Sequence, residues 1–376
     1  MLEIYLDNSA TTKPCKAAIE KMLEVLTSKY GNPSSLHSKG LEAEQEIELT
    51  RGVIAEALGA GAHEIFFTSG GTEANNLAIF GATEANKRKG HKIVTTAVEH
   101  SSVFNAAKEL EKDGYEVVYL TPNKNGEITA SQLEDAIDEK TALVSVMCVN
   151  NELGSLFPVE SLKRAIKLKR APALLHIDAV QAFGKIALNV DKLGVDLLSI
   201  SAHKFHGPKG VGALYVRRGV KIAPRMFGGE QQQKLRPGTE AVPLIAGFGA
   251  AVHQLKLSMQ YEEIRRLNEL CRRELLKIEG IEINSPDTAI PHLLNVSTNA
   301  IKSETMLHFL SSKGIFVSSG SACAKGKKSR VLTEMGLSQR RIDTALRISF
   351  SRYNTESDVE ELVRQIRVGI ETLAHI

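Results

Sequence analysis

The chain has few of the features that mark secreted, metal-binding and membrane proteins. Its 376 residues include only 4 cysteines, and no two of them form a CxxC pair. This spacing argues against a zinc site and a disulfide framework, so we expect reduced thiols and no bound metal. No apolar run approaches the roughly 20 residues that span a bilayer, and residues 1–7 lack the basic start and apolar core of a signal peptide. We therefore expect a cytoplasmic protein that does not bind membranes.

An excess of charge of one sign is also missing. Lys plus Arg number 47 and Asp plus Glu number 44, a formal net charge of +3, so no basic field points to nucleic acid as a partner. Internal repeats and low-complexity segments are absent from the sequence. The hydrophobic fraction of 43% and the charged fraction of 24% are those of an ordinary globular protein. The length predicts two domains, or one large domain with a smaller one.

Apolar runs alternate with helical patterns through the first half of the chain. Strands are predicted at residues 64–68, 92–96, 116–120, 142–148, 174–177 and 195–200. Strands that alternate with helices indicate an α/β protein whose mostly parallel sheet is covered on both faces. In such a sheet, functional side chains gather at the carboxyl ends of the strands.

Polar side chains follow several of these strands. They are His100, Asn151, Asp178 with Gln181, and the group Ser201, His203 and Lys204. Taken singly, each has a plainer interpretation, because most lysines are solvated surface charges and an acid that ends a strand often caps the next helix. Their coincidence at one edge of a sheet instead predicts a catalytic site built around a lysine and a carboxylate.

A glycine-rich turn at residues 69–71 joins a predicted strand to a helix that begins at Thr72. This arrangement directs free backbone N–H groups and the positive helix end at an anion. It is neither a Walker A loop nor a GxGxxG fingerprint, and such turns are common, so alone it supports a phosphate site only weakly. Together, however, a lysine, an aspartate, a flat histidine and a helix N-terminus are the set that pyridoxal phosphate needs.

Seven segments, in chain order, closely resemble motifs of the NifS/IscS-like cysteine desulfurases of the class-V aminotransferase family. They are residues 5–12, 68–73, 99–100, 150–152, 176–181, 201–204 and 318–323. The resemblance implies the aspartate-aminotransferase-like fold of pyridoxal-phosphate enzymes (fold type I). A large domain (residues 13–255) would hold a mostly parallel seven-stranded sheet, and residues 1–12 and 256–376 would form a smaller α/β domain. A long helix over residues 242–278, bent near 258–260, would connect them.

The resemblance also implies residue roles. Lys204 would be the Schiff-base lysine, Asp178 and Gln181 would hold the ring, and His100 would stack on it and move a proton. The remaining predicted cofactor contacts are Gly71, Thr72, Asn151, Ser201, His203 and Thr239. Thr239 would reach the site of the neighbouring subunit, which implies a homodimer.

Substrate recognition is predicted at Asn32, Asn151 and Arg347. Arg347 lies in a strand-like stretch, where a fixed charge needs a partner, and by resemblance it binds the carboxylate of the substrate through two hydrogen bonds.

Cys323 separates the chain from a transaminase. It lies between serines and a basic run that includes Lys325, Lys327 and Lys328, and electropositive surroundings favour the thiolate. The resemblance implies that Cys323 attacks the sulfur of L-cysteine, leaving L-alanine and a persulfide. We expect its segment to be mobile and to deliver sulfur to an acceptor, such as an iron–sulfur scaffold protein.

Two alternatives stay open: another pyridoxal-phosphate lyase or transaminase, such as selenocysteine lyase, and a partner-binding module without turnover.

Overall fold

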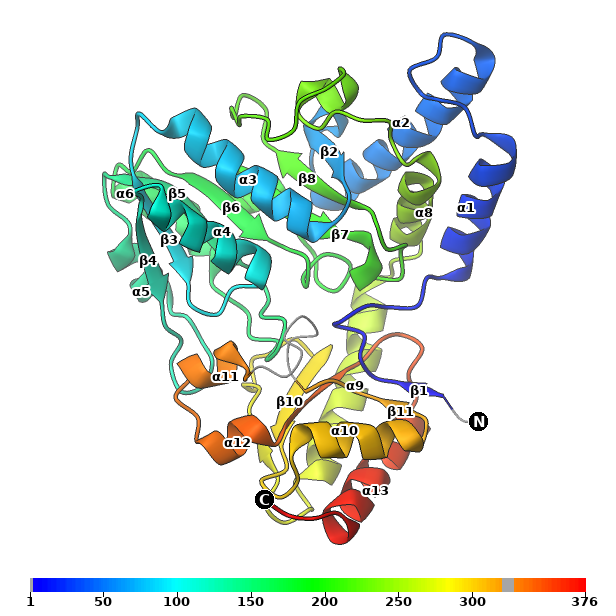
Figure 1. The fold of residues 1–376 in the computed structure, drawn as a ribbon, viewed down its shortest axis with the longest axis vertical. Helices are drawn as coiled ribbons and strands as arrows, with labels where there is room; N and C mark the ends of the chain where they lie inside the picture. The colour runs from blue at the N-terminus through cyan, green and yellow to red at the C-terminus, as the bar shows by residue number, and fades with distance from the viewer. Residues whose placement is uncertain (1–2, 320–327) are drawn as a thin grey trace.

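A seven-stranded sheet organises the larger part of the molecule. The computed structural model describes residues 3–319 and 328–376 (Figure 1). The sheet contains β2 (Ile65–Thr68), β3 (Lys92–Thr96), β4 (Glu116–Leu120), β5 (Thr141–Met147), β6 (Leu174–Asp178), β7 (Leu197–Ser201) and β8 (Gly212–Val216). Its order is β2-β8-β7-β6-β5-β3-β4. β8 runs antiparallel to both of its neighbours, whereas β7, β6, β5, β3 and β4 pair in parallel, which confirms the predicted mostly parallel sheet.

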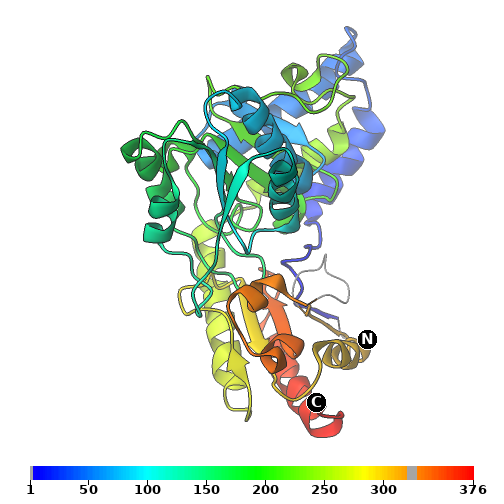
Figure 2. The ribbon, with the colours of Figure 1, turned by 60° about the vertical axis from the view of Figure 1, so that its left-hand side comes forward.

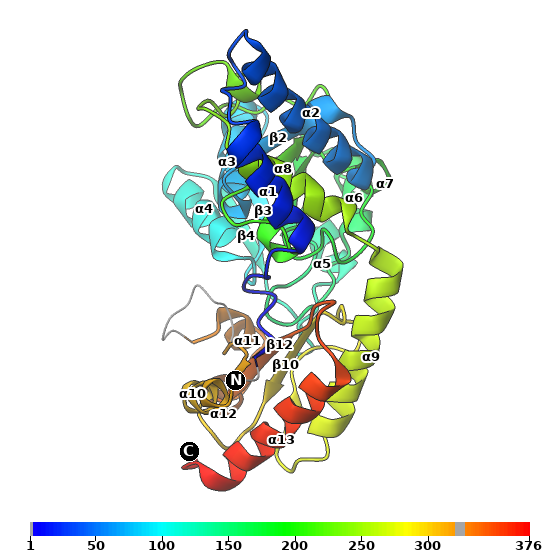
Figure 3. The same ribbon diagram turned by 90° about the vertical axis from the view of Figure 1, so that its right-hand side faces the viewer.

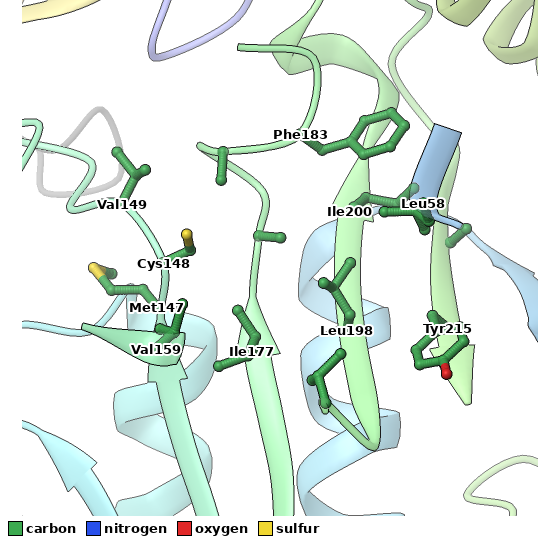
Figure 4. Packing of buried hydrophobic residues seen from close by; sticks show 14 of the residues in the cluster. Leu58, Met147, Cys148, Val149, Val159, Ile177, Phe183, Leu198, Ile200 and Tyr215 are labelled. Atoms are coloured by element: carbon green, nitrogen blue, oxygen red, sulfur yellow. The ribbon is translucent and has the colours of Figure 1, made fainter. Parts of the chain in front are cut away.

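Helices cover both faces of this sheet. One face packs against α3 (Gly71–Asn86) and α4 (Ser101–Lys112), and the other against α2 (Ser38–Leu58), α6 (Leu162–Leu168) and α8 (Val242–His253). Successive strand residues point to opposite faces, so Leu197 packs under α3 and α4 while Leu198 packs on the second face. Figure 4 shows Leu198 on that face between side chains of the two neighbouring strands. Because helices cover both faces, every residue of β2, β3, β5, β7 and β8 is buried, whereas the edge strand β4 is only partly buried.

Three further α-helices belong to this part. They are α1 (Lys16–Ser28), which packs on α8, and α5 (Ala130–Ala136) and α7 (Val190–Leu193). None of the helices in the described ranges is long and apolar enough to cross a membrane.

A smaller region lies below the seven-stranded sheet (Figure 2). Its strands β9 (Glu282–Ile283), β10 (Leu293–Ser297) and β12 (Ala345–Ser349) form an antiparallel sheet, and β1 (Ile4–Tyr5) pairs in parallel with β11 (Ile315–Phe316). Its helices are α9 (Leu257–Leu275), α10 (Ser303–Ser312), α11 (Arg330–Glu334), α12 (Gln339–Asp343) and α13 (Glu356–Thr372). Ile4 and Leu6 share a core with α9, α10 and α13. This packing supports the predicted grouping of residues 1–12 with 256–376, although the exact boundaries stay a prediction.

The helix that was expected over residues 242–278 is divided earlier than the sequence indicated. α8 ends at His253 and α9 begins at Leu257, where Figure 3 shows the chain passing from the large part to the smaller one. Lys256 adopts a non-helical conformation (φ −128°, ψ 67°). The carbonyl of Gln254 accepts a hydrogen bond from Arg352 Nη1 (3.0 Å), so a contact with the smaller region satisfies a carbonyl group at the end of α8.

Candidate active site

A cavity of about 190 Å³ lies at the carboxyl ends of β5, β6 and β7, where the large sheet meets the smaller region. Its wall contains most of the predicted site residues: Gly71, Thr72, His100, Asn151, Asp178, Gln181, Ser201, His203, Lys204 and Arg347. The strand ends therefore bring together residues from positions 71 to 204, as the parallel sheet predicted, and β12 of the smaller region adds Arg347.

Lys204 stands on a short 3₁₀ turn (Ala202–Lys204) directly after β7. Its Nζ donates hydrogen bonds to the carbonyl oxygens of Ser9 (2.7 Å) and Ala10 (2.9 Å). The turn is tied to the same N-terminal segment, because the backbone N–H and the hydroxyl of Thr12 both donate to the carbonyl of His203 (2.9 Å each). The N-terminal segment thus holds the lysine amine at the cavity wall.

Asp178 ends β6 and is only 5% exposed. Its Oδ1 accepts the backbone N–H of Val180 (3.0 Å), the local turn contact that a capping residue makes, but its Oδ2 accepts Asn75 Nδ2 (2.8 Å). Both oxygens are fixed, so the carboxylate keeps one orientation in the cavity. The sequence prediction missed Asn75, which follows Thr72 by three positions and so lies on the same face of α3.

His100 caps the N-terminus of α4. Its Nδ1 accepts the backbone N–H of Ser102 (3.2 Å) and lies 2.8 Å from Ser102 Oγ. Burial lowers the pKa of His100 below its usual 6.5, with nearby Asp178 opposing the change and Lys204 and Arg330 adding to it. The imidazole is therefore neutral at neutral pH, which suits a ring that stacks and passes a proton.

The start of α3 lines the cavity with Gly71 and Thr72. Gly70 has φ 152°, a conformation that side chains rarely adopt, and a Cβ at Gly71 would lie 2.7 Å from Val180 Cγ2. These two glycines let the helix N-terminus reach the cavity. Ser201 and His203 line the same cavity, and burial, with the nearby lysines, lowers the pKa of His203 to about 4.

Gln181 is held in one orientation by a second lysine. Its Oε1 accepts Lys185 Nζ (2.5 Å), and its Nε2 donates to the carbonyl of Ser9 (2.9 Å). Because the carbonyl of Ser9 can only accept, the amide nitrogen must face Ser9 and the amide oxygen Lys185. Burial lowers the pKa of Lys185 to about 7, with Lys204 and Arg347 contributing.

Arg347, in β12, is a buried cation that is 1% exposed. Its Nη1 donates to the carbonyl of Asn151 (3.0 Å) and its Nη2 to Asp7 Oδ1 (3.0 Å). Its Nε, although buried, has no hydrogen-bond partner among the described residues. A guanidinium that lines the cavity with an unused N–H is suited to an anionic ligand such as a carboxylate.

The predicted cofactor fits this donor set. An anchored carboxylate can face a protonated ring nitrogen, a neutral imidazole can lie against a ring, and a glycine-lined helix N-terminus can receive a phosphate. Within residues 3–319 and 328–376, no group of His, Cys, Asp and Glu side chains is suited to hold a metal ion.

Two predicted residues do not line the cavity of their own chain. Asn32 is exposed, and its Oδ1 accepts the backbone N–H of Ser34 (3.0 Å) in a local turn. Thr239 lies exposed in the loop after residues 231–234. A role for either residue at this kind of site therefore requires a second chain or a movement of its loop.

Cys323 lies outside the described residues. The chain before that stretch is held beside Arg347, because the backbone of Ser318 exchanges two hydrogen bonds with that of Arg347 (2.6 and 3.1 Å). After it, Ser329 Oγ donates to Glu152 Oε2 (2.5 Å). The chain is therefore held near the cavity wall on both sides of that stretch. Ser318 contacts Arg347, which lines the cavity, and Ser329 contacts Glu152, which follows the cavity residue Asn151.

The three other cysteines lie inside the protein. Cys15, Cys148 and Cys271 are buried, and burial raises the pKa of Cys148 and of Cys271 to about 12. Since the thiolate is the reactive form, neither of these two thiols is activated.

Comparison with known proteins identifies the family. The model of the class-V aminotransferase family matches residues 4–362. The cysteine desulfurase IscS of Methanosarcina thermophila is 40% identical over 378 residues, which cover 99% of this chain and 93% of that protein. Among solved structures, a NifS-like protein is 38% identical with a TM-score of 0.94, covering 99% of this chain and all of that one. SspA in complex with cysteine is 35% identical with a TM-score of 0.83, covering 94% of this chain and 100% of that one.

These matches extend over nearly the whole chain. The chain therefore belongs to the class-V aminotransferase family and, within it, to the NifS/IscS-like cysteine desulfurases.

Proposed function

We propose that this chain is a pyridoxal-phosphate-dependent cysteine desulfurase that converts L-cysteine to L-alanine and retains the sulfur as a persulfide on Cys323. The observation that carries the proposal is the cavity itself. It combines an amine (Lys204), an anchored carboxylate (Asp178) and a neutral imidazole (His100) with a buried guanidinium (Arg347), whose Nε has no hydrogen-bond partner within residues 3–319 and 328–376.

The residues of the cavity divide between cofactor and substrate. Gly71, Thr72, Ser201 and His203 would hold the phosphate, and Asp178 would pair with the ring nitrogen. When bound, pyridoxal phosphate supplies an electron sink for the charge that develops at the substrate Cα. Lys204 would hold the cofactor in the resting enzyme and, after the substrate amine has replaced it, would remove the Cα proton.

Arg347 would orient the substrate by its carboxylate. Its Nη1 and Nη2 are already held by Asn151 and Asp7, so the guanidinium is fixed in advance of binding. The solved structure of the relative SspA in complex with cysteine supports an amino acid as the ligand of such a cavity. The Asn151 side chain, which lines the cavity, would contact substrate or cofactor.

The sulfur-transfer step requires a second nucleophile. The Cys323 thiolate would attack the substrate sulfur, so that an S–S bond forms while the substrate Cβ–S bond breaks and its electrons pass to the carbon skeleton. Protonation of that skeleton gives alanine, and His100 would pass a proton at the cavity. The sum is L-cysteine plus the Cys323 thiol giving L-alanine plus the Cys323 persulfide, which a sulfur-acceptor protein such as an iron–sulfur scaffold would collect.

Replacing Cys323 by serine should leave cofactor and cysteine binding intact but abolish persulfide formation. After one turnover without acceptor, mass spectrometry of the parent chain should find one additional sulfur atom on Cys323. The buried Cys15, Cys148 and Cys271 act as internal controls and should stay unmodified. Added sulfur on any of these three cysteines, with Cys323 unmodified, would contradict the assignment. Alanine release at the parent rate by the serine variant would favour another pyridoxal-phosphate lyase.

A homodimer is part of the proposal. Ile19, Leu23 and Leu26 of α1, followed by Tyr30, recur at helical spacing and are each more than half exposed. Such an apolar stripe on one helix is typical of a protein interface. Thr239, which does not line the cavity of its own chain, would then reach the phosphate of its partner. A cytoplasmic location stays a prediction from the sequence.

Mixed dimers test the contribution of Thr239 across the interface. A dimer of one Lys204→Ala chain and one Thr239→Ala chain would contain one intact site and one doubly altered site, so about half of the parent activity should remain. Two different affinity tags isolate the mixed dimer for the assay. If Thr239 instead served its own chain, both sites would be damaged, and the mixed dimer would be no more active than the mean of the two parent variants.

A further inference from the structure

Asn75 connects two residues of the cavity that the proposed function uses separately. It lies in α3, and its side chain is almost completely buried. Its Nδ2 group donates to Asp178 Oδ2 (2.8 Å) and to Ser102 Oγ (2.9 Å). The orientation of the amide follows from chemistry, because the opposite orientation would place the Oδ1 atom against a carboxylate oxygen. Both hydrogens of the amino group are therefore in use.

Ser102 extends this link to His100. Since Ser102 Oγ accepts a hydrogen from Asn75, its own single hydrogen can be donated to His100 Nδ1, which lies 2.8 Å away. The backbone N–H of Ser102 points at the same nitrogen (3.2 Å). A nitrogen that receives two donors carries no proton of its own, so the proton of the neutral ring belongs on Nε2.

We propose that Asn75 and Ser102 are positioning residues that connect Asp178 to His100 and fix the His100 tautomer with its proton on Nε2. The chain of donors runs from Ser102 Oγ to His100 Nδ1, and from Asn75 to both Ser102 Oγ and Asp178. The Asn75 amide thus orients two groups. It holds the Asp178 carboxylate directly, and it holds the His100 imidazole through Ser102. The catalytic consequence rests on the proposed function, but the tautomer does not.

The charged groups around His100 come from three other elements. Asp178 ends β6 and raises the pKa of His100, whereas Lys204, after β7, and Arg330, in α11, lower it; burial is the largest cause of the net decrease. Protonation of Nδ1 would also break the bond from Ser102 Oγ. Removal of that hydroxyl should therefore raise the pKa of His100.

Nitrogen NMR of ¹⁵N-histidine-labelled protein tests the tautomer directly, with a His100→Gln variant to assign the signal among the 11 histidines. In the cofactor-loaded parent, His100 Nδ1 should give the shift of an unprotonated nitrogen and Nε2 that of a protonated one. In Ser102→Ala the two shifts should move toward each other and the pKa of His100 should rise. Ser102→Thr, which keeps a hydroxyl, should restore the parent spectrum.

Ser145→Ala is a matched control, since Ser145 Oγ lies 2.8 Å from Nδ1 of another buried histidine, His176. This variant should change the His176 signal and leave that of His100 in place. Unchanged His100 shifts and pKa in both Ser102→Ala and Asn75→Ala would overturn the inference, whether or not the protein desulfurates cysteine.

Turnover supplies the second readout. Ser102→Ala should lower kcat by about tenfold, the lower end of the effects found when the hydrogen-bond partner of a metal-ligating histidine is removed. KM should be nearly unchanged, because the Ser102 hydroxyl is engaged with Asn75 and His100. The acid limb of its pH–rate profile should move to higher pH, since the raised pKa keeps the imidazole charged over a wider range. If the proposed function is wrong, the parent protein will not turn over cysteine. The NMR measurement would still decide the tautomer of His100.

Discussion

Replacing Lys204 by alanine is expected to lower the rate of alanine formation from cysteine by at least about a thousandfold, because the variant lacks the base that would take the Cα proton. The fold should persist, since the lysine amine donates to the carbonyls of Ser9 and Ala10, and water can replace it at the wall of an open cavity. After borohydride treatment of the cofactor-loaded parent, mass spectrometry should find the chain heavier by one reduced cofactor, attached at Lys204. The Lys204→Ala chain should gain no such mass.

Two other lysines make this experiment specific. Lys89 is exposed at the surface, and Lys89→Ala should retain the activity and the cofactor attachment of the parent. Lys185 is the nearest competitor, because its lowered pKa of about 7 leaves much of its amine unprotonated at neutral pH. Reduced cofactor found on Lys185 in the parent, or parent-like turnover by Lys204→Ala, would contradict the assignment of Lys204.

Replacing Asp178 by alanine is expected to weaken cofactor binding and to slow Cα deprotonation by about a hundredfold or more, the usual cost of removing a preorganised electrostatic partner. The variant also leaves Asn75 Nδ2 and the backbone N–H of Val180 without the carboxylate that accepts from them. The direct measurement is exchange of the substrate Cα proton with deuterium, which reports deprotonation separately from sulfur transfer.

Asp178→Asn separates charge from shape, because it keeps the size of the side chain while removing its negative charge. It should be as slow in exchange as Asp178→Ala if the charge is what matters. Asp287→Ala, at a fully exposed aspartate, should exchange at the parent rate. Parent-like exchange in both Asp178 variants would reduce Asp178 to a local turn residue that only accepts the N–H of Val180.

The sequence alone determined the class of fold and most of the cavity wall. Strands at residues 92–96 and 116–120 were predicted with the bounds that the structure gives, because each is a short run of β-branched and aromatic residues that alternates with helical patterns. Lys204, Asp178 and His100 could be assigned to one site for a similar reason, since parallel strands present their carboxyl ends at one edge.

The tertiary structure decided what holds these residues. The carbonyls of Ser9 and Ala10 receive Lys204, which is almost 200 positions later, and Asp7 pairs with Arg347 across 340 positions. Contacts at such separations depend on the order in which strands pair and on the return of the N-terminal segment beside β12, and neither leaves a local pattern in the sequence.

Asn75 and Ser102 show the same limit within the site. An asparagine inside a helix and a serine in the first turn of another helix are common in sequences, and their polar atoms meet only because α3 and α4 pack together on one face of the sheet. Thr239 and Asn32 mark the opposite case, since one chain alone does not bring them to its cavity. The residue types of a motif stand close together in the sequence, so the sequence alone could predict the catalytic groups. The partner that orients each catalytic side chain comes from a distant element, so only the tertiary structure decided it.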